Sequence, residues 1–428
     1  MSAATSPGLT VGLIATSGRA GGAGNGAVLV PHARPGSSID GEHRHIKETQ
    51  VCGSCSSEES QVSAGRGLSR RGLLVGGAGL VATAAAVATA GPAAATSPAG
   101  GPHPKRGMRV VTLGTQGGPP PTVERAGTSS VVVVDGKNYL VDAGRAAVTQ
   151  YVRARLDFAD LSAMFITHLH ADHVADYFNF FLLAGNYSPE QHDALAGPIP
   201  VYGPGGAGGL PPTFGGGTSP TTSPEDPTPG LLALTDHSAK ALAYSTNVFM
   251  RDSAIRETRS LADVREIVLP SGSGASSTNT APPMAPFVIM EDDRVRVSAV
   301  LVPHGPVFPA FAYRFESDHG VITFSGDTTY SENLLRLAEG SDILVHESIN
   351  IQGWNGPAAL KDHLIESHVE VQKVGAVAEA AAAKHLVLSH IGDLATEVVH
   401  VPTWRRWAQQ GYTGTVDIAT ELQAYRVR

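Results

Sequence analysis

The sequence predicts a mixed α/β fold in which layers of sheet and helix pack together. Short apolar segments of strand length alternate with helical patterns from residue 108 onward. Several strand pairs are joined by hairpin signals such as Asp135-Gly136, which argues against a purely parallel, doubly wound sheet. The chain has 428 residues, 42% of them hydrophobic, and is therefore long enough to bury a sizeable core.

The expected elements follow one another with turn residues between them. The first strand begins after Met108 and is followed by a Gly/Pro turn through Pro121. The strand candidates, in chain order, are 109–114, 130–135, 139–142, 163–167, 200–202, 294–302, 311–315, 321–325, 343–346 and 386–389. Helices are expected from Ser331 to Ala338 and from Glu366 to Ala383.

The sequence of the N-terminal region predicts that the protein is exported, and it does not predict a folded domain there. Residues 1–65 are rich in Gly, Ser and Ala, and we expect them to be disordered, or not translated if the true start lies near 51–66. Arg70-Arg71 precede an uncharged run of small and apolar residues, which is the layout of a twin-arginine signal peptide over 66–98 with cleavage near Ala95. A transmembrane helix is the alternative, but Gly and Ala insert poorly.

This layout implies the twin-arginine export machinery as a partner and only transient contact with the membrane. The expected location is extracellular or periplasmic, in the cell envelope.

The composition limits which metals and partners the chain can bind. Cys52 and Cys55 are the only cysteines, so a disulfide framework and a four-cysteine zinc site are both excluded. Any metal must be held by His, Asp or Glu. The chain has 31 Lys+Arg against 39 Asp+Glu, a formal net charge of −8, which argues against a nucleic-acid backbone as partner.

Residues 203–286 differ in composition from the segments on either side, and we interpret them as an insertion into the domain. The glycine-rich start at Gly203-Pro204-Gly205 is interpreted as a linker, because no Lys-Ser/Thr follows it as in a phosphate-binding loop. A helix is expected further on, where four apolar side chains share one helical face: Leu231, Leu234, Leu242 and Phe249. That helix either packs on the core or forms a lid over the active site.

A dense polar motif, Thr167-His168-Leu169-His170-Ala171-Asp172-His173, follows the strand that ends at Ile166. Burying three imidazoles and a carboxylate together would cost several kcal/mol unless something compensates them. A divalent cation would do so, and the motif therefore predicts a metal site.

The motif resembles the HxHxDH hallmark of the metallo-β-lactamase superfamily. Further motifs similar to those of the family end predicted strands in the expected order: Pro303-His304-Gly305, Ser325-Gly326-Asp327-Thr328 and Ser389-His390. The resemblance covers 108–425 apart from the insertion. It implies a hydrolase domain over 105–428 with an αββα sandwich, in which two mixed sheets are flanked by helices.

The resemblance also implies two metal ions per chain. His168, His170 and His304 would bind the first, Asp172, His173 and His390 the second, and Asp327 would bridge them. Ligands without thiolate suit Zn²⁺, with Mn²⁺ or Fe left open. Two such ions would supply a bridging hydroxide as nucleophile near neutral pH, and Asp172 would orient it.

Two more motifs, around His346-Glu347 and Ser367-His368, resemble the ribonuclease Z and arylsulfatase-like branch. In that branch Glu347 would hold His368, and His368 would protonate the leaving oxygen or stabilise charge on the scissile group. A surface position for His368 and a purely structural role for Glu347 are the alternatives.

Two departures from ribonuclease Z count against RNA. Where that family carries Pro-x-Lys-x-Arg-Asn, this chain has Pro121-Thr122-Val123-Glu124-Arg125-Ala126. The segment after Gly203-Pro204 is poor in positive charge, where a basic arm that grips tRNA would be expected. Lys and Arg supply most of the affinity for a phosphate backbone, so nucleic acid is not the favoured partner.

The expected function is that of an exported dinuclear hydrolase that cleaves a small or medium ester, first a sulfate or phosphate ester in an arylsulfatase-like reaction. A phosphodiesterase or ribonuclease Z-like 3′-end nuclease is the alternative, as is a lactone or carboxylic ester hydrolase. A non-catalytic metal-binding protein and a true β-lactamase are less favoured, and a homodimer stays open. Aromatic residues after the motif line a pocket or, as we favour, pack in the core: Tyr177, Phe178, Phe180, Phe181 and Tyr187.

Overall fold

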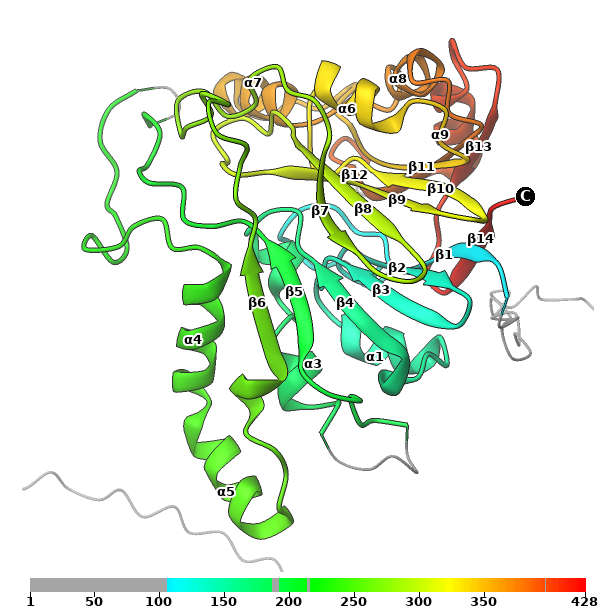
Figure 1. The fold of residues 1–428 in the computed structure, drawn as a ribbon. Coiled ribbons are helices and arrows are strands. Elements are labelled where there is room, and N and C mark those ends of the chain that lie inside the picture. Colours follow the sequence, from blue (N-terminus) through cyan, green and yellow to red (C-terminus); the bar gives the residue numbers. More distant parts are fainter. Residues whose placement is uncertain (1–105, 187–191, 214–215, 397) are drawn as a thin grey trace, which may run out of the picture. The chain divides into compact units, whose positions relative to one another are not determined.

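The structure, a computed structural model, describes residues 106–186, 192–213, 216–396 and 398–428. The expected extension 1–65 and signal peptide 66–98 lie outside these residues. In the described part, two β-sheets pack together with helices on their outer faces (Figure 1). No helix in this part is long and apolar enough to cross a membrane.

The first sheet is antiparallel at one side and parallel at the other, in the order β14-β1-β2-β3-β4-β5-β6. The β2–β3 hairpin turns at Asp135 and Gly136, which both have positive φ, as the predicted tight turn requires. Its strands are β1 (Met108–Gly114), β2 (Ser129–Val134), β3 (Lys137–Val141), β4 (Leu161–Phe165), β5 (Ile199–Gly203), β6 (Ala262–Glu266) and β14 (Gln423–Arg426).

The second sheet repeats this arrangement in the order β13-β12-β11-β10-β9-β8-β7, with β10 to β13 parallel and the other neighbours antiparallel. Its strands are β7 (Phe287–Glu291), β8 (Arg296–Leu301), β9 (Phe311–Ser317), β10 (Gly320–Phe324), β11 (Ile343–Asn350), β12 (His385–Asp393) and β13 (Thr415–Ile418).

Three apolar clusters define the layers. The middle cluster joins side chains of both sheets, among them Val132 and Phe165 of the first and Phe315 and Val345 of the second. The two outer clusters lie between each sheet and its helices. The αββα sandwich of two mixed sheets is therefore confirmed.

The helices are short, and most of them lie on the outer faces of the sheets. On the first sheet they are α1 (Ala147–Arg153), α2 (Ala171–Val174), α3 (Asn179–Leu182) and α4 (Leu231–Ala241), with 3-10 turns η1 (Phe158–Asp160) and η3 (Thr258–Leu261). Helix α5 (Ala243–Ser253) follows α4 and extends beyond the sheet (Figure 1). The second sheet carries α6 (Glu332–Ala338), α7 (Ala358–Ser367), α8 (Val374–Ala380) and α9 (Val401–Ala408). Helix α6 is the predicted helix at 331–338, with Ser331 as its N-cap through a bond from the Leu334 amide.

The predicted helix from Glu366 to Ala383 is wrong as one element. Helix α7 ends at Ser367, and His368 is extended with φ −140° and ψ 161°. The chain then runs beside β11, where the Val371 amide donates to the Ile349 carbonyl, before α8 begins. Tertiary hydrogen bonds to β11 thus override the local helix propensity of the segment.

The segment 203–286 supplies parts of the first layer. Strand β6 pairs with β5, and the fully buried Leu231 anchors the start of α4 on the core. The predicted helix is present as two, α4 and α5, with Phe249 exposed on α5. The aromatic residues 177, 178, 180 and 181 pack in the outer core, as favoured, whereas Tyr187 lies outside the described residues.

Candidate metal centre

The predicted ligands come together at one edge of the two sheets. The motif 167–173 follows β4, while His304 and Asp327 follow β8 and β10. Between β10 and Asp327 the chain turns at Gly326, which has φ 59° and approaches the Phe311 carbonyl so closely that a Cβ would clash with it. Glycine is therefore needed to aim Asp327 inward.

His390 lies inside a strand rather than after one. The predicted strand 386–389 extends to Asp393, and the register with β11 shifts so that two residues of β12 stand opposite Glu347. His390 has φ 53° at this bulge. The extra residue turns the side chain toward the site, as bulges beside active sites do.

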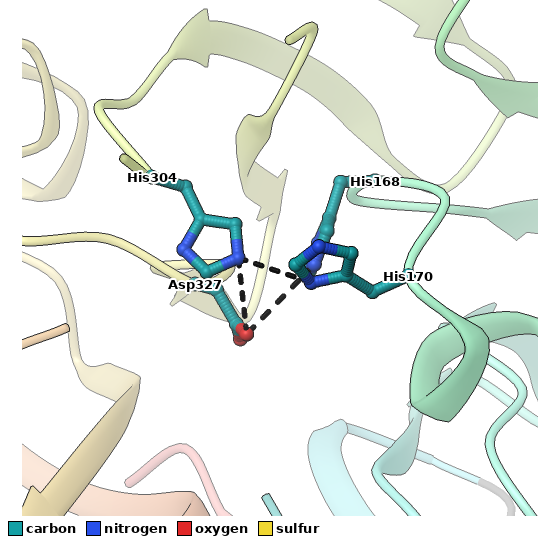
Figure 2. A group of neighbouring side chains, drawn as sticks. All are labelled: His168, His170, His304 and Asp327. Atoms are coloured by element: carbon teal, nitrogen blue, oxygen red, sulfur yellow. Dashed lines mark hydrogen bonds and ion pairs between the residues drawn. The ribbon is translucent and has the colours of Figure 1, made fainter. Parts of the chain in front are cut away.

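Seven side chains form two adjoining groups of metal-ligating atoms. The first cluster, shown in Figure 2, comprises His168, His170, His304 and Asp327, and the second comprises Asp172, His173 and His390. Within each group the ligand atoms lie within 4.8 Å of one another. The structure thus brings all seven predicted ligands together, although their assignment to individual metals stays a prediction.

Asp327 lies between the two clusters. Its Oδ2 is 3.8 Å from Nε2 of both His168 and His304 in the first cluster. The same oxygen is 3.4 Å from Nε2 of His173 and 3.1 Å from Nε2 of His390 in the second. One carboxylate oxygen therefore faces imidazoles of both groups, which is the position that a bridging ligand needs.

The unpaired polar atoms of the site fit a cation. Nε2 of His168, Nε2 of His173 and Oδ1 of Asp172 are buried without a hydrogen-bond partner in the described structure. Leaving such groups unsatisfied is costly, and a metal ion would satisfy them together. The donor set, imidazole nitrogen and carboxylate oxygen, is one that zinc and similar divalent ions accept.

The protonation of the first-cluster imidazoles is also suited to binding a cation. Burial lowers the pKa of His168 well below its usual range, and burial likewise lowers the pKa of His304 to about 3. At Asp327 burial raises the pKa, but the neighbouring His390 and His173 outweigh it and hold that pKa well below its usual value. In the first cluster, neutral imidazoles beside an ionised carboxylate present the lone pairs that a metal needs. His173 of the second cluster differs, because burial lowers its pKa but Asp327 and Asp142 outweigh burial and raise that pKa well above its usual value, so a cation binding there would displace a proton.

Second-layer contacts orient three of the imidazoles. His304 Nδ1 is 2.9 Å from the Ser367 carbonyl, which directs its Nε2 inward. His173 Nδ1 is 2.9 Å from Asp142 Oδ2, and the Thr167 hydroxyl lies 3.1 Å from His168 Nδ1. Such partners fix the tautomer and direction of a ligating histidine.

The role of Asp142 was not anticipated from the sequence. It follows β3 at φ 56°, and its other carboxylate oxygen accepts the Thr167 amide at 2.8 Å, which joins β3 to the start of the motif. A single Asp after a strand belongs to no spaced motif that would identify it as a site residue. The one usable signal in the sequence is the turn Asp142-Ala143-Gly144 directly after a buried strand.

Asp142→Asn is expected to weaken binding of a divalent metal ion roughly 10- to 100-fold, because the amide cannot hold His173 as the carboxylate does. Asparagine keeps the volume and tolerates the left-handed backbone. Competition titration against a chelator measures the affinity. Asp135→Asn is the matched control, since Asp135 is exposed and also left-handed at φ 46°; an unchanged affinity in Asp142→Asn would show that Asp142 does not position His173.

Gly117 and Gly118 also border the second cluster without having been predicted. The Gly118 amide donates to Asp172 Oδ2 at 2.9 Å. At Gly117 a Cβ would lie 2.8 Å from His390 Nδ1, so only glycine lets the loop pass this imidazole. The loop between β1 and β2 therefore covers the second cluster.

His368 and Glu347 lie beside the clusters and face each other. Glu347 Oε1 accepts the Val369 amide at 2.7 Å, and its Oε2 lies 3.3 Å from His368 Nδ1. The carboxylate is buried, whereas the His368 side chain is 14% exposed. Burial lowers the pKa of His368, but the Glu347 carboxylate outweighs this and raises it to about 9.

His368 also has a second possible role that the sequence did not suggest. Its ring lies 5.0 Å from that of His304, and a ring nitrogen falls within 4.8 Å of ligand atoms of Asp327 and His390. The structure therefore brings the predicted pair together at the site and places His368 within reach of the ligand atoms as well as of Glu347.

Comparison with known proteins gives a family match, curated relatives and similar solved structures. Residues 122–188 match the model of the metallo-β-lactamase superfamily. The chain is 26% identical to the ribonuclease Z of Mycobacterium bovis over 328 residues, 75% of this chain and 98% of that protein, and 26% identical over 324 residues to the ribonuclease Z of Mycolicibacterium paratuberculosis, with the same coverage of both chains. A solved structure of the short form of human tRNase Z is 19% identical, covers 75% of this chain and all of its own, and superposes with a TM-score of 0.49.

The match to the superfamily model includes the motif 167–173 that carries four of the seven clustered side chains. The curated relatives align over nearly their whole length. Together these findings support the metallo-β-lactamase superfamily, and with it a hydrolase activity, for this chain.

Proposed function

We propose that the chain is a metal-dependent phosphodiester hydrolase. The observation that carries the proposal is the Glu347–His368 pair beside the two ligand clusters, because a diester has a leaving oxygen that benefits from a nearby proton donor. Relatives named ribonuclease Z support a phosphodiester bond, the alternative that the sequence offers, over the sulfate or phosphate ester of the arylsulfatase-like reaction expected first.

We propose zinc as the resident metal, with the first and second clusters each holding one ion and Asp327 serving both. Bound there, the ions would polarise the phosphoryl group and lower the pKa of a coordinated water. The cluster residues themselves would hold the phosphate end of the substrate at the sheet edge.

The Glu347–His368 pair would deliver the proton. Glu347 is fixed by the Val369 amide, and its Oε2 faces Nδ1 of His368 at 3.3 Å as an ion pair, so the imidazole would present its other nitrogen to the substrate. His368 is the partly exposed member of the pair and can therefore reach the leaving oxygen of a bound ester.

A panel of chromogenic substrates tests the proposed function. Zinc-loaded protein should hydrolyse a 4-nitrophenyl phosphodiester faster than the phosphate monoester, the aryl sulfate, the carboxylic ester or a lactone, and a chelator should abolish this turnover. Faster hydrolysis of the aryl sulfate than of the phosphodiester would instead favour a sulfatase. A precursor tRNA trimmed at its 3′ end more efficiently than any small diester would identify a nuclease.

We further propose that the protein is exported by the twin-arginine route. Replacing Arg70 and Arg71 by lysine should retain the protein inside the cell, since the paired arginines are the recognised feature of such a signal. Cell fractionation with antibody detection measures the location. Arg66→Lys is the matched control and should be exported; export of the doubly substituted protein would refute the route.

A further inference from the structure

A large cavity adjoins the first cluster and is not explained by metal binding. It has a volume of about 670 Å³, within the range of small-molecule sites. Its wall includes Leu169 and His170 of the metal motif, so it opens beside a predicted ligand. The remainder comes from Val174, Ser277 and the chain around residues 204–211, 227–241 and 306–309.

The lining of this cavity is apolar and without formal charge. Leucine, proline, alanine, valine and phenylalanine form most of it, among them Leu210, Leu234 and Phe308. No Lys, Arg, Asp or Glu is among the residues that line it, and its titratable side chains are His170 and His237. A nucleotide chain would find no cation here to neutralise its phosphates.

We infer that the cavity binds an uncharged apolar group of the ester, an alkyl chain or aryl ring, while the ester's phosphate lies at the metal clusters. The inference deepens the proposed function and rests on it for the position of the phosphate. His170 belongs to both the first cluster and the cavity wall, so one substrate can span the two. Burial of the apolar group would stabilise binding by removing it from water.

Binding of two phosphonates tests the cavity without requiring turnover. Octylphosphonate and methylphosphonate carry the same charged head, so the ratio of their dissociation constants, measured by calorimetry on zinc-loaded protein, reports the tail alone. We expect octylphosphonate to bind roughly 100-fold more tightly, because several methylenes leave water.

Three substitutions locate the tail. Leu210→Lys places a charge at the cavity and Ala207→Phe fills it, and each should reduce the preference for octylphosphonate by roughly tenfold or more, as expected when a few buried methylenes are lost. Leu232→Lys is the matched control and should keep the preference: Leu232 and Leu210 are both exposed, at 43% and 54%, but Leu232 does not line the cavity.

Three results would overturn the inference. The unsubstituted protein could bind octylphosphonate no more tightly than methylphosphonate. Both cavity variants could keep the preference for octylphosphonate, or Leu232→Lys could lose it to the same extent. A second assay, hydrolysis of methyl and octyl 4-nitrophenyl phosphodiesters, distinguishes failure of the cavity inference from failure of the proposed function. Turnover of both without a binding preference would reject the cavity alone. A binding preference without turnover of either diester would reject the phosphodiesterase and retain the cavity.

Discussion

Asp327→Ala is expected to remove most of the bound metal from both clusters. The Asp327 Oδ2 atom is the one carboxylate oxygen within 4 Å of imidazoles of both groups in the described structure, so its loss deprives each of its shared anion. It also leaves buried imidazoles facing one another without a charge between them. The metal content of the purified protein should fall from about two zinc ions toward none, since both clusters lose the carboxylate that they share.

Two variants distinguish this effect from general unfolding. Asp327→Asn keeps the volume but not the charge and should also lose metal, with far-ultraviolet circular dichroism close to that of the parent. Asp318→Ala removes an exposed carboxylate and should retain both ions. Two zincs retained in Asp327→Ala would disprove the bridging role and separate the two clusters.

The strands that could be predicted from the sequence are the buried ones. Strands β2, β9 and β11 lie between two neighbouring strands and carry a short apolar stretch, and the sequence locates each of them within a few residues. The four strands that escaped prediction, β6, β7, β13 and β14, are the outermost in their sheets. Edge strands are short and partly exposed, which leaves no clear alternation to detect.

The segment from Ser367 to Val374 shows why local propensity fails at the site. Its sequence continues into an alanine-rich helix, yet Glu347 and Ile349 of β11 take hydrogen bonds from Val369 and Val371. These contacts come from residues some twenty positions away and cannot be read locally. The break in the helix is what places His368 beside Glu347.

The ligands were predictable because most of them end apolar strands, where loops converge. The groups that position these ligands could not be predicted. Ser367 acts through its backbone carbonyl, a group that every residue carries, and Gly117 acts through the space that it leaves for His390. The cavity is likewise assembled from separate stretches of chain, around residues 169–174, 204–211, 227–241, 277 and 306–309, and the glycine- and proline-rich stretch among them is one that the sequence predicts to be a linker. Only the tertiary structure shows that this stretch forms a wall.

His368→Ala is expected to keep both metals and to lose turnover in a way that depends on the leaving group. A general acid contributes roughly 10²- to 10⁴-fold where the leaving oxygen is a poor one. A diester with an alkoxide leaving group should therefore slow by about that factor, whereas a 4-nitrophenyl diester, whose leaving group needs little protonation, should slow far less. Steady-state kinetics on both substrates, together with metal analysis, measures the difference.

Two further variants make the result specific. Glu347→Gln can still accept the Val369 amide but no longer carries the charge that faces His368, so it should show the same leaving-group dependence in weaker form. His319→Ala, at an exposed histidine paired with Asp135, should match the parent. If His368→Ala loses a metal ion, the histidine is a ligand grouped with Asp327 and His390; if it keeps full activity on both diesters, its role as an acid is wrong, because the proton must then reach the leaving oxygen from another donor.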